Sequence, residues 1–247
     1  MERISFLIDN KRISVLKGSR ERIFYIHGSG GDAEIWKNQL MDLGGYAIDL
    51  PNHGKSENAE IRSVDDYAYF VAEIVKKIAG KAIVVGHSLG GAVAQKVYLN
   101  HKEIVEALVL VGTGARLRVL PSVLEGLKIK ASETSKIVAN VAFHRKEFVE
   151  QFAKLFEERA KILLEDLMLC DAFDILEDYK AGKIRFEVPT IAIVGEHDLL
   201  TPLKYSEFFA KYGAELRVIK NAGHMVMLEN PLEFNAELKK FIDQLKR

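Results

Sequence analysis

The sequence predicts an α/β protein in which one mostly parallel sheet domain is interrupted by a helical insertion. Strand-sized apolar runs alternate with helical patterns in residues 1–114, and the alternation returns in residues 186–247. Residues 115–185 carry helical patterns rich in Leu, Phe, Lys and Glu, without a convincing strand. Alternating strands and helices build a parallel sheet covered by helices. The predicted core domain therefore comprises residues 1–114 and 186–247, and the insertion comprises residues 115–185.

The expected strands begin with a hairpin, because alternating patterns flank the turn residues Asp9 and Asn10. Its two arms are residues 2–8 and 11–17. Later runs are more continuously apolar, which is typical of strands covered on both faces. The further strands are expected at residues 22–26, 45–50, 81–86, 105–111, 188–194 and 215–219.

Three helix starts stand out between these strands. Ser63 precedes an amphipathic pattern as a candidate N-cap. Thr201 is expected to cap a helix with Pro202 at its first position. Asn230 followed by a proline is a further start, before an apolar stripe that runs to the end of the sequence.

Composition excludes several function classes. Lysine plus arginine equals aspartate plus glutamate, 35 of each, so a nucleic-acid partner has no electrostatic support. The longest apolar runs are strand-sized, which predicts no membrane span and no signal peptide. The single cysteine, Cys170, allows no intrachain disulfide, and we expect a cytoplasmic protein. No metal-ligand spacing appears, so neither a metal nor a cofactor is expected.

The strongest chemical signal is the segment Gly86-His87-Ser88-Leu89-Gly90. It follows an apolar strand pattern and opens a helix, which is the context of a nucleophile elbow. On such a turn a side chain two residues before or after the serine would collide with neighbouring backbone. Glycine stands at both places, and Ser88 is therefore the predicted nucleophile.

A serine hydroxyl needs a base, and His224 is the predicted one. It lies after the last strand pattern and before the final helix, on a loop that can reach back over the carboxyl edge of the sheet. His87 is expected to point away from the nucleophile. His27 and His53 lie in glycine-containing turns and are expected to hold loops by hydrogen bonds.

The base in turn needs an acid that fixes its tautomer. Asp198 follows the strand at 188–194 and precedes the Thr201 helix start, which places it on a strand-end loop. Glu196 is its nearest competitor. The chain order serine, aspartate, histidine is the order expected of this site type.

The tetrahedral oxyanion needs hydrogen-bond donors. The glycine-rich segment 27–31 follows the third strand pattern, and its glycines permit close approach of the backbone. We predict that the main-chain N–H groups of Ser29 and Leu89 are the donors, with Gly30 as the alternative to Ser29.

These motifs together resemble the α/β-hydrolase superfamily over nearly the whole chain. The resemblance rests on the segments 27–30, 49–56, 86–90, 195–198 and 223–224. Asn52 stands where that family usually has glycine. The resemblance implies an eight-stranded sheet with a helical cap, here residues 115–185. Epoxide hydrolases and haloalkane dehalogenases use aspartate at the position of Ser88 and are disfavoured.

The expected function is that of a serine hydrolase that cleaves carboxylic esters of small to medium, largely apolar molecules through an acyl-enzyme. Phe143 and Met225 are candidate pocket residues beside the serine. The same triad could serve a lactonase, thioesterase, perhydrolase or carbon–carbon bond hydrolase. A weakly catalytic receptor or scaffold is the alternative from another class. The oligomeric state stays open.

Overall fold

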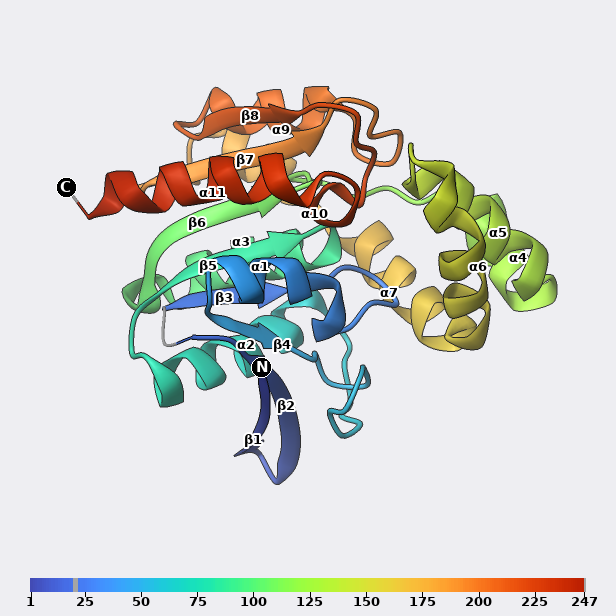
Figure 1. The fold of residues 1–247 in the computed structure, drawn as a ribbon, viewed down its shortest axis with the longest axis horizontal. Helices are drawn as coiled ribbons and strands as arrows, with labels where there is room; N and C mark the ends of the chain where they lie inside the picture. Colours follow the sequence, from blue (N-terminus) through green and yellow to red (C-terminus); the bar gives the residue numbers. More distant parts are fainter. Residues whose placement is uncertain (20–21, 247) are drawn as a thin grey trace.

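A computed structural model describes residues 1–19 and 22–246 and shows one eight-stranded sheet in the order β1-β2-β4-β3-β5-β6-β7-β8 (Figure 1). The hairpin β1–β2 is antiparallel, β2 is antiparallel to β4, and all other neighbours are parallel. The predicted α/β fold and all its strands are confirmed, with ends that shift by up to two residues. The strands are β1 (Glu2–Ile8), β2 (Lys11–Lys17), β3 (Ile23–Ile26), β4 (Tyr46–Ile48), β5 (Ala82–His87), β6 (Val105–Val111), β7 (Thr190–Gly195) and β8 (Glu215–Ile219).

Helices cover both faces of this sheet. The described residues form α1 (Lys37–Asp42), α2 (Val64–Ile78), α3 (Leu89–Asn100), α4 (Pro121–Ile129), α5 (Ala131–Ala142), α6 (Val149–Glu158), α7 (Ala160–Ala172), α8 (Leu176–Lys180), α9 (Leu203–Ala210), α10 (Val226–Glu229) and α11 (Pro231–Leu245), with short 3₁₀ turns at Ala33–Trp36, Lys102–Ile104 and Lys146–Phe148. None of the helices within the described part of the chain has the length and apolar character needed to cross a membrane.

Two apolar cores sandwich the sheet because successive strand side chains point to opposite faces. In β3, Phe24 and Ile26 join the core that contains side chains of α2, α3 and α9, whereas Ile23 and Tyr25 join the core that contains side chains of α1 and α11. Figure 1 shows α1 and α11 in front of the sheet. Strands β3 to β7 are buried along almost their whole length, whereas the edge strand β8 is partly exposed. Loops at the carboxyl ends of the buried strands are therefore the places available for chemistry.

The helix starts agree with the sequence at two of three places. Ser63 forms a capping box with Asp66, and the Asn230 side chain caps α11 by accepting the Glu233 N–H. The expectation for Thr201 was wrong: α9 begins at Leu203 with Pro202 as its N-cap residue. The Thr201 hydroxyl instead donates to the Asp198 carboxylate, as described below.

Helices α4–α8 lie between β6 and β7 in the chain, and we call residues 115–185 the helical segment. Its described residues contribute no strand to the sheet, and their one β pairing is an isolated bridge between Arg116 and Asp174. In Figure 1, α4, α5 and α6 stand beyond the end of the sheet toward which the strand arrows point, and α7 lies between them and the sheet.

Candidate active site

Ser88 lies on the sharp turn between β5 and α3, at the carboxyl edge of the sheet. Its backbone has φ 53° and ψ −117°, a conformation that costs energy for a residue with a side chain. The Ser88 N–H donates to the Val111 carbonyl at 2.9 Å, which ties the turn to the neighbouring strand β6. The strained turn is thus held by the sheet itself.

The glycines around this turn are required by close backbone contacts. A Cβ on Gly86 would lie 2.0 Å from the Gly90 carbonyl oxygen, and one on Gly90 would lie 2.4 Å from that of Ile26. Such distances are impossible for real side chains. Collision of a Cβ with neighbouring backbone therefore explains the glycines at positions 86 and 90, as the sequence predicted.

His224 and Asp198 come from loops after β8 and β7 and are hydrogen-bonded to each other. His224 Nδ1 lies 2.9 Å from Asp198 Oδ2, and both residues are buried. The Thr201 hydroxyl donates to the same oxygen at 2.8 Å, and its main-chain N–H donates to Asp198 Oδ1 at 2.8 Å. An ionised carboxylate only accepts, so Nδ1 carries a proton and Nε2 is left as an acceptor. The sequence reasoning missed this role of Thr201.

The carboxylate of Asp198 stays ionised in the folded protein. Burial by itself would raise its pKa, but the His224 charge, the hydrogen bond with that ring and those from Thr201 outweigh burial. The pKa of Asp198 therefore lies below its usual 3.8.

The lowered pKa predicts a stability contribution that acid removes. A group with a depressed folded-state pKa stabilises the fold above its unfolded pKa, and this contribution is lost as pH falls through the folded value. The free energy of unfolding of the wild type should therefore fall more steeply below about pH 4 than that of Asp198→Asn. Denaturant titrations from pH 7 down to about pH 3 measure both slopes. Equal slopes would contradict the ionised, hydrogen-bonded Asp198.

The loop that carries His224 is anchored at several points. The His224 N–H donates to the Ala142 carbonyl at the end of α5, at 2.9 Å. The buried Glu229 accepts from the Gly223 N–H at 2.8 Å through Oε1 and from the Arg145 N–H at 2.8 Å through Oε2. The position of the His224 ring thus depends on contacts of its loop with both the core and the helical segment.

His87 does not point away from the site, contrary to the sequence expectation. Its ring lies 4.7 Å from the His224 ring, centroid to centroid, and its Nε2 donates to the His224 carbonyl at 3.0 Å. Burial and the nearby charge of His224 lower the pKa of His87 to about 3, so the ring is neutral. Within the described residues its Nδ1 finds no hydrogen-bond partner. The physical reason is that His87 is the last residue of β5, so it lies at the same carboxyl edge of the sheet as the loop that carries His224.

The two predicted oxyanion donors lie on either side of Ser88. Ser29 lines a cavity together with Ser88, and Leu89 opens α3 directly after it. No acceptor for the Ser29 or Leu89 main-chain N–H is found among the residues that the structure describes. The alternative donor, Gly30, is already engaged, because its N–H donates to Asp166 Oδ2 at 2.8 Å. The geometry therefore favours Ser29 over Gly30.

Two cavities meet at Ser88 and His224, and both are mostly apolar. The inner cavity, of about 60 Å³, is lined by Ile35, Ala142, Phe152, Phe156, Leu163 and Met225, among others. The outer cavity, of about 310 Å³, is lined by Leu117, Leu120, Val123, Ile137, Val141 and Leu199, among others. Val138, Leu167 and Leu200 separate and line both.

Of the two candidate pocket residues, the structure places one in a cavity. Met225 lines the inner cavity. Phe143 lines neither: it is buried and packs against Phe148 and Phe152, with ring centroids 5.4 and 4.6 Å away. Phe143 therefore belongs to the packing of the helical segment and not to a cavity wall. No group of three His, Cys, Asp or Glu side chains suited to a metal ion occurs in residues 1–19 and 22–246.

The alpha/beta hydrolase family model matches residues 23–237, and the chain belongs to this family. A solved structure of a thermophilic esterase is 55% identical and superposes with a TM-score of 0.97, covering 99% of this chain and 98% of that one. The pimeloyl-[acyl-carrier protein] methyl ester esterase of Neisseria meningitidis is 27% identical over 90% of this chain and 94% of its own. The 2-hydroxy-6-oxo-6-(2'-aminophenyl)hexa-2,4-dienoic acid hydrolase of Metapseudomonas resinovorans is 25% identical over 90% of this chain and 84% of its own.

Proposed function

We propose that the protein is a serine hydrolase that cleaves carboxylic esters of small to medium, largely apolar molecules. The observation that carries this proposal is the arrangement at the carboxyl edge of the sheet. Ser88 and His224 line the same cavities, and Asp198 holds the far nitrogen of the His224 ring at 2.9 Å. Such an arrangement can turn a weak hydroxyl nucleophile into a reactive one.

In the proposed first half-reaction, Ser88 Oγ attacks the ester carbonyl carbon and His224 Nε2 takes the hydroxyl proton. The developing imidazolium is stabilised by the ionised Asp198, which keeps its charge because its pKa is lowered. Negative charge on the carbonyl oxygen is met by the N–H groups of Ser29 and Leu89. Collapse of the tetrahedral species breaks the ester C–O bond, and the imidazolium returns the proton to the leaving alcohol.

In the second half-reaction, water replaces the alcohol. His224 takes a proton from water, and the resulting hydroxide attacks the acyl carbon bound to Ser88. The second tetrahedral species expels Ser88 Oγ, which recovers its proton from the imidazolium. The products are a carboxylic acid and an alcohol, and the protein returns to its starting state.

We also propose that the helical segment acts as a cap over this site and that residues 1–114 and 186–247 form the core domain. The support is that α5, α6 and α7 supply apolar side chains to both cavities, for example Val138, Phe152 and Leu167. An apolar enclosure favours uncharged substrates, because an unpaired charge loses its hydration on entry. The single cysteine, Cys170, is buried and free, which suits the proposed cytoplasmic location.

The similarity to named esterases supports ester hydrolysis over the other reactions of this fold. The Metapseudomonas resinovorans relative makes carbon–carbon bond hydrolysis the second candidate. A screen of p-nitrophenyl esters beside lactones, amides, thioesters and a vinylogous diketone separates these reactions. Turnover of esters at least tenfold above every other class is expected. Equal or greater turnover of the diketone would favour the second candidate.

The acyl preference should follow the apolar volume of the outer cavity. Each buried methylene adds up to about 0.8 kcal/mol, or about fourfold in kcat/KM, until the space is full. Acyl chains of short to medium length should therefore exceed acetate in kcat/KM, and a charged acyl group should be poor. A series from acetate to palmitate measures the trend.

A matched pair of substitutions locates the acyl site. Val141 lines the outer cavity, so Val141→Phe should reduce kcat/KM for the longer chains more than for acetate. Lys136 lies on the same helix and is exposed, and Lys136→Phe should leave the series unchanged. A wild-type series that falls steadily from acetate would contradict the apolar acyl pocket.

A further inference from the structure

One face of α7 lies along the loop that carries the proposed oxyanion donor, residues 28–32. Arg159, Leu163, Asp166 and Cys170 are spaced by four, three and four residues, which places them on one side of a helix. Each one contacts this loop, which we call the donor loop. A single stripe of the helical segment thus lies over a single loop of the core.

The main chain at Gly30 is held from both sides by this stripe. Its N–H donates to Asp166 Oδ2 at 2.8 Å, and its carbonyl accepts from the Arg159 guanidinium at 3.1 Å. Gly30 has φ +66°, and a Cβ there would lie 3.2 Å from the Leu163 side chain. Gly30, the residue that follows Ser29, is therefore fixed in a left-handed backbone conformation against α7.

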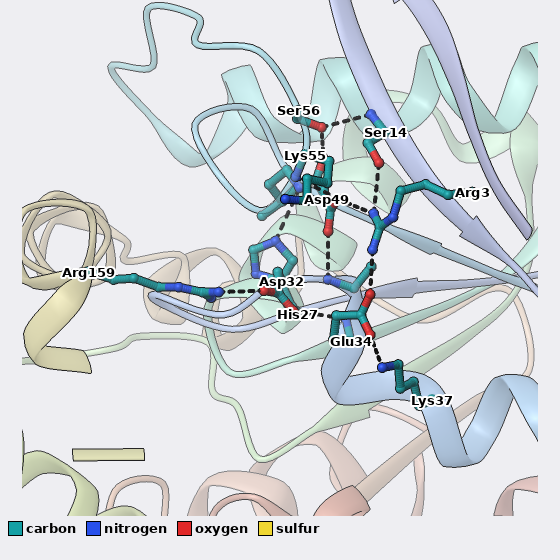
Figure 2. Close-up of polar contacts among 12 residues, drawn as sticks. Arg3, Ser14, His27, Asp32, Glu34, Lys37, Asp49, Lys55, Ser56 and Arg159 are labelled. Carbon is teal, nitrogen blue, oxygen red and sulfur yellow. Dashed lines mark hydrogen bonds and ion pairs between the residues drawn. The ribbon is translucent and has the colours of Figure 1, made fainter. Parts of the chain in front are cut away.

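Arg159 makes a second contact with the donor loop. Its guanidinium donates to Asp32 Oδ2 at 2.7 Å, and Figure 2 shows the side chain reaching from the helical segment to Asp32. Burial alone would raise the pKa of Asp32, but its hydrogen bond and ion pair with Arg159 outweigh burial and lower the pKa. Arg159 thus spans the loop from Gly30 to Asp32 as a bidentate cation.

Asp166 is itself fixed by the core on its other side. It is fully buried, accepts from the Tyr67 hydroxyl at 3.0 Å, and pairs with His53 Nε2 at 2.9 Å. Burial would lower the pKa of His53, but the Asp166 charge and hydrogen bond outweigh it and raise the pKa. Asp166 therefore joins α7, the donor loop and the core in one buried cluster.

Directly after the donor loop, the chain is held by the core. The Ala33 N–H donates to the buried Asp49 at 2.8 Å. Asp49 also accepts from Arg3 at 2.5 Å and from the Lys55 N–H at 3.0 Å. At the other end, the Gly28 carbonyl accepts from the His27 ring at 2.8 Å and from the Gly31 N–H at 3.1 Å, which are also core contacts. Between these two core anchors, Arg159 and Asp166 hold the main chain at Gly30 from the helical segment.

We propose that Arg159 and Asp166 are positioning residues for the oxyanion site: they set the main chain beside Ser29 so that its N–H points at the reacting carbonyl oxygen. This inference rests on the proposed function. The position of α7 against the donor loop then matters for stabilisation of the oxyanion as well as for enclosure of the substrate. A displacement of about 1 Å at such a donor costs up to about a hundredfold in rate.

The test is a set of variants on α7 with two readouts. Arg159→Met should lower kcat by about tenfold or more with KM changed by less than about threefold, since ground-state binding is apolar. Arg159→Lys should recover part of the loss. Asp166→Ala should lose kcat similarly, whereas Asp166→Asn should keep most of it because its amide oxygen can still accept from Gly30. Lys161→Met and Glu165→Gln, exposed on the same helix, should change nothing.

Inhibitor binding separates positioning from a merely structural role. A trifluoromethyl ketone forms a tetrahedral oxyanion adduct with the serine, whereas the matching alcohol does not. Across the variants, Ki for the ketone should rise in proportion to the loss of kcat/KM, and Ki for the alcohol should stay constant. Parallel losses for both ligands, or losses that track thermal unfolding alone, would overturn the proposal.

Amide exchange measured by NMR tests the contacts without relying on activity. The Gly30 N–H should be protected in the wild type and exchange at least tenfold faster in Asp166→Ala. An unprotected Gly30 in the wild type would overturn the inference even with full esterase activity. A protected Gly30 in a protein that hydrolyses no ester would instead contradict the proposed function.

Discussion

Replacement of Ser88 by alanine should lower kcat for an ester by about 10³-fold or more while the fold is kept. The loss is large because the hydroxyl is the atom that becomes acylated, and what remains comes from the donors and binding alone. Steady-state kinetics with a p-nitrophenyl ester measures the loss, and thermal unfolding checks the fold. The substitution should not relieve the backbone strain at residue 88, because alanine would have to adopt the same positive φ.

Covalent labelling identifies the nucleophile directly. A fluorophosphonate should label Ser88 in the wild type and fail to label Ser88→Ala. Ser29 is the other serine of the inner cavity and supplies the matched control. Ser29→Ala keeps the main-chain N–H, so activity within about tenfold of wild type and full labelling are expected. Labelling at a different serine, with Ser88→Ala still active, would refute the assignment.

The second large effect is expected at Asp198. Asp198→Asn should lower kcat on the order of 10³-fold or more, since an amide cannot favour the Nδ1-protonated tautomer or stabilise the imidazolium. Glu196→Gln should cost far less, because Glu196 is exposed and its carboxylate accepts from the Asn221 N–H at 3.2 Å and lies 3.7 Å from His197, on the surface side of the loop. Kinetics of both variants with the same ester makes the comparison. A reversed order of the two losses would assign the acid to Glu196.

The strands and the strained turn were predictable because each leaves a local mark in the sequence. Continuous apolar runs mark strands covered on both faces, and the glycines at 86 and 90 mark backbone that approaches backbone. The pairing of Asp198 with His224 follows from the place of each residue after a strand, since parallel strands bring their carboxyl ends to one edge.

Other features depend on long-range contacts that leave no local mark. Asp166 reads as one more polar residue of a helical pattern, yet two of its partners, Gly30 and His53, lie on loops more than a hundred residues earlier in the chain, and Tyr67 lies on α2, 99 residues earlier. Phe143 is an apolar aromatic residue of the kind that can line a pocket, but its neighbours in the structure are other buried side chains such as Phe152. Thr201 resembles a helix cap, but the Asp198 carboxylate competes successfully for its hydroxyl.

The pairing of β6 with β7 has a consequence for how freely this chain could be rebuilt. The two strands are parallel, with Leu108 opposite Thr190 and Val111 opposite Ile193, so the chain leaves β6 at the carboxyl edge of the sheet and must cross back to the amino end of β7. For a closed loop, each doubling in length costs only about 0.6 kcal/mol of chain entropy. A change in the length of this connection is therefore cheap in chain entropy, provided that it spares the returning segment, where Phe173, Ile175 and Tyr179 are buried in the core that contains side chains of α2 and α3. A graft from another family member that keeps this returning segment should fold, but it recovers a competent donor loop only if it brings its own partners for the Gly30 N–H and the Gly30 carbonyl.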